Sequence, residues 1–268
     1  MSHKIIALLS CICLAFLGAI TMSCGSSSSS GSAGCTGGPY DVVGDWTLDV
    51  GSSSGPGIIN SSGLAVFFQT SILTPAPGDV VVLPNITGTC SFSGTGNAYS
   101  TFVGGGGSAS DSVQGNVNSA TSITGKISNG NSFSLVPNAA LSSGSVAGLS
   151  GAGWLGEIEG AEEPVIWDIV LSLSGSGNSM SFTGAGLLPS GATCNINGTF
   201  NQEGGNSANL NVFDTSITFG EGCPFTSVSG LGFESTSDYF GLNGNAQGAY
   251  LYAASSSSAA VLEIFKLQ

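Results

Sequence analysis

Apolar and polar residues alternate along short segments of this chain, and Gly, Ser, Asn and Pro separate the segments. In the segment 41–50 (DVVGDWTLDV), Trp46, Leu48 and Val50 share one parity and polar residues share the other. Successive side chains of a β-strand point to opposite faces, so this segment is expected to be a strand with one face in a core and one in water. No window indicates an amphipathic helix of three turns.

Comparable segments recur at the spacing of about 8 to 12 residues that is typical of sandwiches and barrels. We expect strands at 41–50, 64–70, 79–88, 98–103, 121–127, 132–136, 165–175, 179–184, 192–200, 208–214, 215–220, 248–254 and 259–267. Loops are expected at 142–163 and at Gly104 to Gly107, where no lysine follows to suggest a phosphate site. The pattern predicts an all-β fold, an antiparallel barrel or sandwich.

Two parts of the body are faintly similar. The stretch ITGTCSFSGTG around Cys90 is like SGATCNINGTF around Cys194, and TSITGKI is like TSITFGE. The body is therefore expected to be either two similar β halves, 39–141 and 142–268, or one large barrel. Pairing of the final segment, 259–267, with the first would remove two exposed edges.

The amino terminus combines a short basic start with a long apolar run. His3 and Lys4 precede an apolar stretch, 5–22, which fits a secretory signal or a membrane span. Cys24, Gly25 and a serine run follow, without a cationic stop-transfer residue.

This segment resembles the signal peptide of bacterial lipoproteins, which is cut after a Leu-small-small sequence and before a cysteine that carries lipid. Here the sequence is Thr21-Met22-Ser23-Cys24, in which Ser23 fits and the two residues before it depart from the commonest pattern. Leu8-Leu9-Ser10-Cys11 matches better, but it leaves an unusually short apolar region. The resemblance implies a signal peptide at 1–23, a tether at 24–38 and a body at 39–268, with the lipid on Cys24. It implies a protein of the outer membrane or cell surface; a plain signal peptide or signal anchor, and a periplasmic or secreted protein, are the alternatives.

The charge of the mature chain excludes several functions. It would hold Lys126 and Lys266 against 16 Asp and Glu, a net charge of −14, without arginine or histidine. Nucleic acids and anionic lipid head groups need cationic partners, so neither is expected to bind. Histidine-based catalysis and zinc ligation lack their ligand.

Four cysteines remain beyond Cys24, and an even number in an exported chain favours disulfides. They allow three pairings. We expect Cys35 with Cys90 and Cys194 with Cys223, because each bridge then stays within one half. A metal site of four thiolates is the weaker alternative, since no Cys-x-x-Cys pair occurs.

An acidic and aromatic group lies in GEIEGAEEPVIWD and just before it. Its members are Trp154, Glu157, Glu159, Glu162, Glu163, Trp167 and Asp168. Such a group could be a solvated loop, a Ca²⁺ site or carbohydrate contact, or the carboxylate pair of a glycoside hydrolase. Since sequence neighbours on a loop need not converge, the solvated loop is the favoured interpretation.

Gly44-Asp45-Trp46 resembles the Gly-x-Trp of lipocalins and related calycin barrels, whose tryptophan plugs the barrel base. The resemblance implies a carrier of a small apolar ligand, but the arginine that lipocalins place against this tryptophan is absent. An ordinary core tryptophan is the favoured alternative.

Together these features predict a non-catalytic, membrane-anchored lipoprotein of the cell envelope with a binding, adhesive or structural role. Ser, Thr and Asn surfaces of low charge suit contact with carbohydrate or with another envelope protein. The alternatives are a calycin-like carrier and, less favoured, a carboxylate-dependent hydrolase.

Overall fold

The computed structural model describes residues 39–69, 79–83, 85–100, 107–128, 130–139, 141, 149–160, 166–203, 211–235, 247–254 and 259–266. These residues form the sixteen strands β1–β16, and the expected all-β class is confirmed. Within these ranges the structure has no helix with the length and apolar character needed to cross a membrane.

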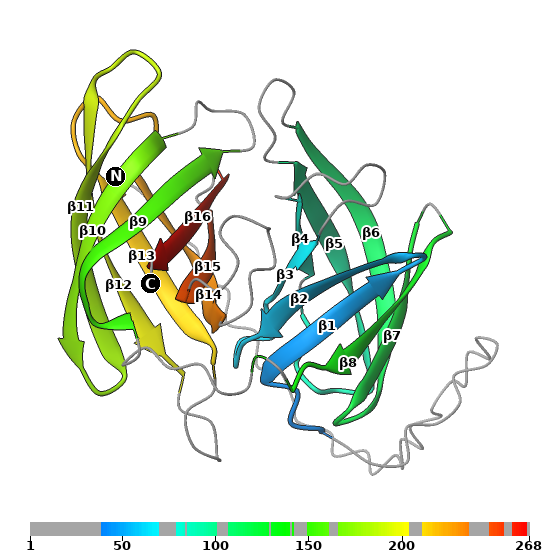
Figure 1. Ribbon diagram of the computed structural model, residues 1–268. Helices are drawn as coiled ribbons and strands as arrows, with labels where there is room; N and C mark the ends of the chain where they lie inside the picture. The colour runs from blue at the N-terminus through cyan, green and yellow to red at the C-terminus, as the bar shows by residue number, and fades with distance from the viewer. Residues whose placement is uncertain are drawn as a thin grey trace, which may run out of the picture. The chain divides into compact units, whose positions relative to one another are not determined.

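The first eight strands form a closed antiparallel barrel, coloured blue to green in Figure 1. Each strand pairs with the next, and β8 pairs with β1. The strands are β1 (Gly44–Val50), β2 (Ser53–Ile59), β3 (Ala65–Gln69), β4 (Asp79–Leu83), β5 (Ser91–Ser100), β6 (Gly107–Ser119), β7 (Ser122–Ile127) and β8 (Ser132–Pro137).

The second eight strands form another closed antiparallel barrel with the same neighbour-to-neighbour order. It closes through pairing of β9 with both β10 and β16. The strands are β9 (Gly151–Gly160), β10 (Ile166–Ser176), β11 (Ser179–Leu187), β12 (Thr193–Gln202), β13 (Phe213–Phe219), β14 (Ser227–Ser235), β15 (Gln247–Ala254) and β16 (Ala259–Lys266).

The expected pairing of the last segment with the first is wrong. Strand β16 closes the second barrel on β9, and β1 closes the first barrel on β8. The chain forms two closed barrels instead of one large barrel, and closure leaves neither barrel with an unpaired edge strand.

Four strands lie where the sequence analysis placed none: β2, β6, β9 and β14. Their sequences are rich in Gly and Ser, and β2 contains Pro56, so they read as turns. The predicted loop at 142–163 is wrong at its carboxyl-terminal end, because β9 occupies 151–160.

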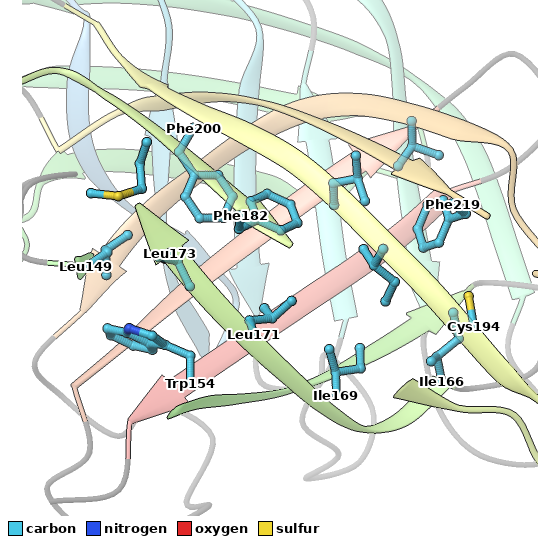
Figure 2. Close-up of a cluster of buried hydrophobic side chains, with 14 of the residues drawn as sticks. Leu149, Trp154, Ile166, Ile169, Leu171, Leu173, Phe182, Cys194, Phe200 and Phe219 are labelled. Atoms are coloured by element: carbon cyan, nitrogen blue, oxygen red, sulfur yellow. The ribbon is translucent and has the colours of Figure 1, made fainter. Parts of the chain in front are cut away.

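Each barrel encloses an apolar core made by the alternating residues of its strands. Strand β13 shows the pattern, with buried Phe213, Thr215, Ile217 and Phe219 between exposed residues. Figure 2 shows part of the second core, where the rings of Phe182 and Phe200 stack with centroids 4.7 Å apart. The buried side chains of these two cores are at most 7% exposed.

Glycines facing inward make room for these rings. A Cβ at Gly125 would overlap the ring of Phe133, and a Cβ at Gly198 would overlap the ring of Phe182. Each ring thus lies against the backbone of the adjacent strand, where only glycine fits. The two barrels therefore use one device to fill a narrow interior.

A third apolar cluster joins the barrels, and the residues of both belong to one compact unit of the chain. It combines outward-facing residues of β2–β4 with Leu141 of the linker and residues of the second barrel. Its members are Ile58, Val66, Phe68, Val80, Val82, Leu141, Val212, Leu231 and Phe233. The rings of Phe68 and Phe233 meet edge to face with centroids 5.4 Å apart. Strand β3 is consequently buried on both faces, which explains its unbroken apolar sequence AVFF.

Candidate functional site

The predicted lipid and disulfide sites are resolved only in part. Cys24 and Cys35 lie outside the described residues. Cys194 and Cys223 form the expected disulfide, with Cα atoms 5.3 Å apart. Cys90 is also disulfide-bonded. The Cys194–Cys223 bridge ties β12 to the segment between β13 and β14, at one end of the second barrel.

The acidic and aromatic group is not one loop. Glu157 and Glu159 belong to β9, where they are paired with β16, and Asp168 belongs to β10. Glu162 and Glu163 lie outside the described residues. Among the residues that the structure describes, no group of three or more Asp, Glu, His or Cys is placed to hold a metal ion.

The tryptophans of this group differ in what the structure describes. Trp154 has no exposed surface and packs in the second core, so it cannot stack on a sugar from outside; its predicted role in carbohydrate contact is wrong. Trp167 is a strand residue whose pairing with Leu187 precedes a shift in register. Asp168 follows it, exposed, with φ of 50°, in the irregular part of β10.

The Gly-x-Trp segment lies at the start of β1. Trp46 is 3% exposed, packs in the first core and donates its indole N–H to the Val42 carbonyl at 2.8 Å. Trp46 therefore packs in the core of the first barrel and fixes the start of β1 through its bond to Val42.

Asp45 is the most perturbed carboxyl that the structure describes. Its Oδ1 is buried and has no hydrogen-bond partner among the described residues. It lies opposite Ile58 of the inter-barrel cluster, and its backbone carbonyl accepts the Asn138 N–H. Burial without a compensating partner disfavours the charged form and raises the pKa of Asp45 to about 7.

Two polar contacts accompany the shared apolar cluster: one ties the linker to the second barrel, and the other joins the two barrels. The buried Asn211 amide donates to the carbonyls of Leu141 and Glu234 at 2.6 and 2.7 Å, and accepts the Glu234 N–H at 2.8 Å. The Glu203 carboxylate accepts the N–H and the hydroxyl of Ser61 at 2.9 and 3.0 Å. Burial raises the pKa of Glu203 and nearby Asp214 acts in the same direction, while the two bonds from Ser61 lower it. These contacts hold the first barrel and the linker against the second.

The outer surface of the second barrel carries a regular array of hydroxyl and amide side chains, which we call the polar ladder. Strand register aligns its members in three rows across β10–β14. The first row is Ser172, Thr183, Asn197, Thr218 and Ser227. The second row is Ser174, Ser181, Thr199, Ser216 and Ser229. The third row is Ser176, Ser179, Asn201 and Asp214.

Nearly all of the ladder side chains are exposed, and Thr199 is half-buried. Ser179 donates to the Asn201 amide oxygen at 2.8 Å in the third row. In the first two rows, no hydrogen bond between side chains is found within the described part of the barrel. Their donors and acceptors therefore face solvent, or a ligand, rather than one another.

An apolar row borders the ladder. Leu155, Val170 and Ala185 are register partners on β9, β10 and β11, and Leu187 lies two residues beyond Ala185. Val170 is 54% exposed and Leu187 is 44% exposed, which is unusual for large apolar side chains in this structure.

The sequence analysis predicted a surface rich in Ser, Thr and Asn, but it did not locate the polar ladder. Its signal was present in the alternate Ser, Thr and Asn positions of β10–β13, but the register that aligns them depends on the barrel. Comparisons with protein-family models, curated proteins and solved structures found no match for this chain.

Proposed function

We propose that this chain is a non-catalytic binding protein of a bacterial cell envelope, anchored to the membrane by a lipid on Cys24. The tether at 24–38 would hold the two-barrel body away from the bilayer. The role that fits this body best is adhesion or structural contact with another component of the envelope.

The observation that carries the proposal is the contrast between the inside and the outside of the barrels. The inward-facing side chains that the structure describes form a mostly apolar, buried core in each barrel, whereas the outer surface of the second barrel presents the polar ladder. A carrier of apolar ligands needs an open interior, and a binding protein needs an open exterior. We therefore favour surface binding over ligand carriage.

Intact-mass analysis of the detergent-extracted native protein tests the anchor. We expect a lipid-modified mass that begins at Cys24 in the wild type and is lost in Cys24→Ala. Membrane fractionation of the same two proteins should show the wild type with membranes and the variant in the soluble fraction. An unmodified wild-type mass that begins elsewhere would contradict the proposal and make the chain a free secreted protein.

A further inference from the structure

We propose that the polar ladder of the second barrel binds a neutral polysaccharide chain, with the adjoining apolar row against the apolar face of a sugar ring. This inference rests on the proposed binding function and adds to it the class of ligand and the surface that binds it.

The chemistry of the ladder matches that of sugar hydroxyls. Ser and Thr hydroxyls donate and accept, and the Asn197 amide offers donors on one atom and an acceptor on another. In the first two rows these groups are not engaged with one another among the described residues. Side chains repeat at about 4.8 Å across strands and about 6.7 Å along a strand, a spacing close to the size of one hexose unit.

Charge selects a neutral polymer over an anionic one. The ladder contains one carboxylate, Asp214, and no cation. The mature chain would carry a net charge of −14, so a sulfated or uronate-rich polymer would be repelled. A neutral polysaccharide meets no such penalty.

The apolar row is a second and independent indication of a sugar ligand. Pyranose rings have an apolar face of C–H groups beside their hydroxyls. Val170 exposes apolar surface directly beside the first row of hydroxyls and amides, and Leu187 exposes more one step farther from that row. This patch is narrow, whereas the core of a protein–protein interface needs larger, aromatic-rich apolar contact.

The curvature of the barrel favours a chain over a flat crystalline surface. The rows run across five strands of a closed barrel, so they follow its convex surface. A flexible polysaccharide can follow this curve. Each hydrogen bond exchanged with water adds little net affinity, so several must act together.

The test is native-gel retardation of the detergent-solubilised full-length protein by dextran, laminarin or yeast mannan, with dextran sulfate as the anionic probe. The ladder variant combines Thr183→Val, Thr199→Val and Thr218→Val, which removes hydroxyls while keeping β-branched side chains. The control combines Thr47→Val and Thr95→Val on the outer surface of the first barrel, where Thr124 is left in place because it accepts a hydrogen bond from Asn118. Thermal unfolding checks that both variants fold as the wild type does.

We expect at least one neutral polysaccharide to retard the wild type and the control equally, and the ladder variant to bind about tenfold more weakly. Val170→Ser combined with Leu187→Ser should weaken binding severalfold, and dextran sulfate should not retard the wild type. Binding that survives in the ladder variant would overturn the ladder as the site while leaving a binding function in place. Absence of retardation by all three neutral polymers, or equal retardation by dextran sulfate, would overturn the ligand class. The mass measurement on Cys24 tests the lipid anchor independently of this result.

Discussion

The two barrels share a scaffold and differ in what surrounds it. Both are closed barrels of eight antiparallel strands, and in both a core phenylalanine ring packs against a glycine of the adjacent strand. On the outer surface of the first barrel, Ser110 donates to Asn97 at 2.7 Å and Asn118 donates to Thr124 at 3.0 Å. On the second barrel, the first two rows of the polar ladder have no such bonds among the described residues.

The comparison shows that two barrels with the same kind of core differ in their outer surfaces. The outer faces of β2–β4 in the first barrel are covered by the inter-barrel cluster, and that barrel also holds the buried carboxyl oxygen of Asp45. The second barrel carries the Cys194–Cys223 bridge and an open polar surface. The inter-barrel cluster attaches the two barrels, and the ligand contact proposed above belongs to the polar surface.

The largest effect that we expect comes from Asp45→Asn. Because the folded pKa is about 7, the folded state keeps a proton that the unfolded chain releases near pH 4. Wild-type stability should therefore fall as pH rises from about 4 to about 7, by about 4 kcal/mol in all. Asp45→Asn should remove this fall and be the more stable protein at pH 8.

Urea unfolding at pH 4, 5, 6, 7 and 8 measures this difference. Asp49→Asn is the matched control, because residue 49 lies on the same face of the same strand, and it should leave the wild-type fall in place. If the free energies of unfolding of wild type and Asp45→Asn change with pH in parallel, burial of Asp45 does not distinguish the first barrel from the second.

Removal of the Cys194–Cys223 bridge should weaken the second barrel selectively. The two cysteines are 29 residues apart, and a loop of this length is associated with about 3.6 kcal/mol of stability. In Cys194→Ala with Cys223→Ala, we expect the environment of Trp154 to unfold at lower denaturant than that of Trp46.

Fluorescence of two versions of this variant separates the two barrels: Trp46→Phe leaves the tryptophans of the second barrel, and Trp154→Phe with Trp167→Phe leaves Trp46 of the first. The same two versions of the disulfide-bonded chain are the controls, and they should unfold together because the inter-barrel cluster couples the barrels. Loss of both signals at one denaturant concentration in the bridge variant would mean that coupling outweighs the difference between the barrels.

Gly125→Ala and Gly198→Ala test the device that the barrels share. The added methyl group would overlap the ring of Phe133 in the first barrel and of Phe182 in the second. Each substitution should destabilise the protein by about 2 kcal/mol, as expected for overpacking of a filled core. Gly220→Ala is the control, since its Cβ would lie 3.3 Å from the nearest atom, and it should cost much less. Denaturant midpoints provide the measurement, and a neutral result at one of the two core glycines would show that the barrels are filled differently.

Sequence alone predicted the class of fold but not the way its parts close. Alternation in segments such as 44–50 follows from burial of one face, so it is visible in the sequence. Strand β6 has Val113 and Val117 as its buried apolar residues, and Gly115 accommodates the Phe92 ring, so its contribution to the core depends on a neighbour. The closure of β16 on β9 is equally non-local.

The candidate site depended on the same non-local information. The Cys194–Cys223 disulfide was predicted from the number and positions of the cysteines, and the hydroxyl- and amide-rich surface of low charge was predicted from the composition. The polar ladder needed the register of five strands, and the burial of Trp154 needed the barrel interior. The unbroken apolar run AVFF was the available signal for the inter-barrel cluster, because a strand that is covered on both faces has apolar residues at every position.

The smallest effect should come from the polar contact between Glu203 and Ser61. Glu203→Gln keeps the size of the side chain and removes its charge: the amide oxygen can accept the Ser61 N–H and the amide NH2 can donate to the Ser61 hydroxyl, so two bonds to a carboxylate become two neutral bonds. Because Ser61 is exposed, the expected loss is about 1 kcal/mol or less at pH 7. Ser61→Ala should match it, and the double variant should lose less than the sum of the two, as measured by urea unfolding in a double-mutant cycle. Strict additivity would show that this contact does not couple the barrels. The apolar cluster, together with the bond from Asn211 to Leu141 of the linker, would then hold the barrels together.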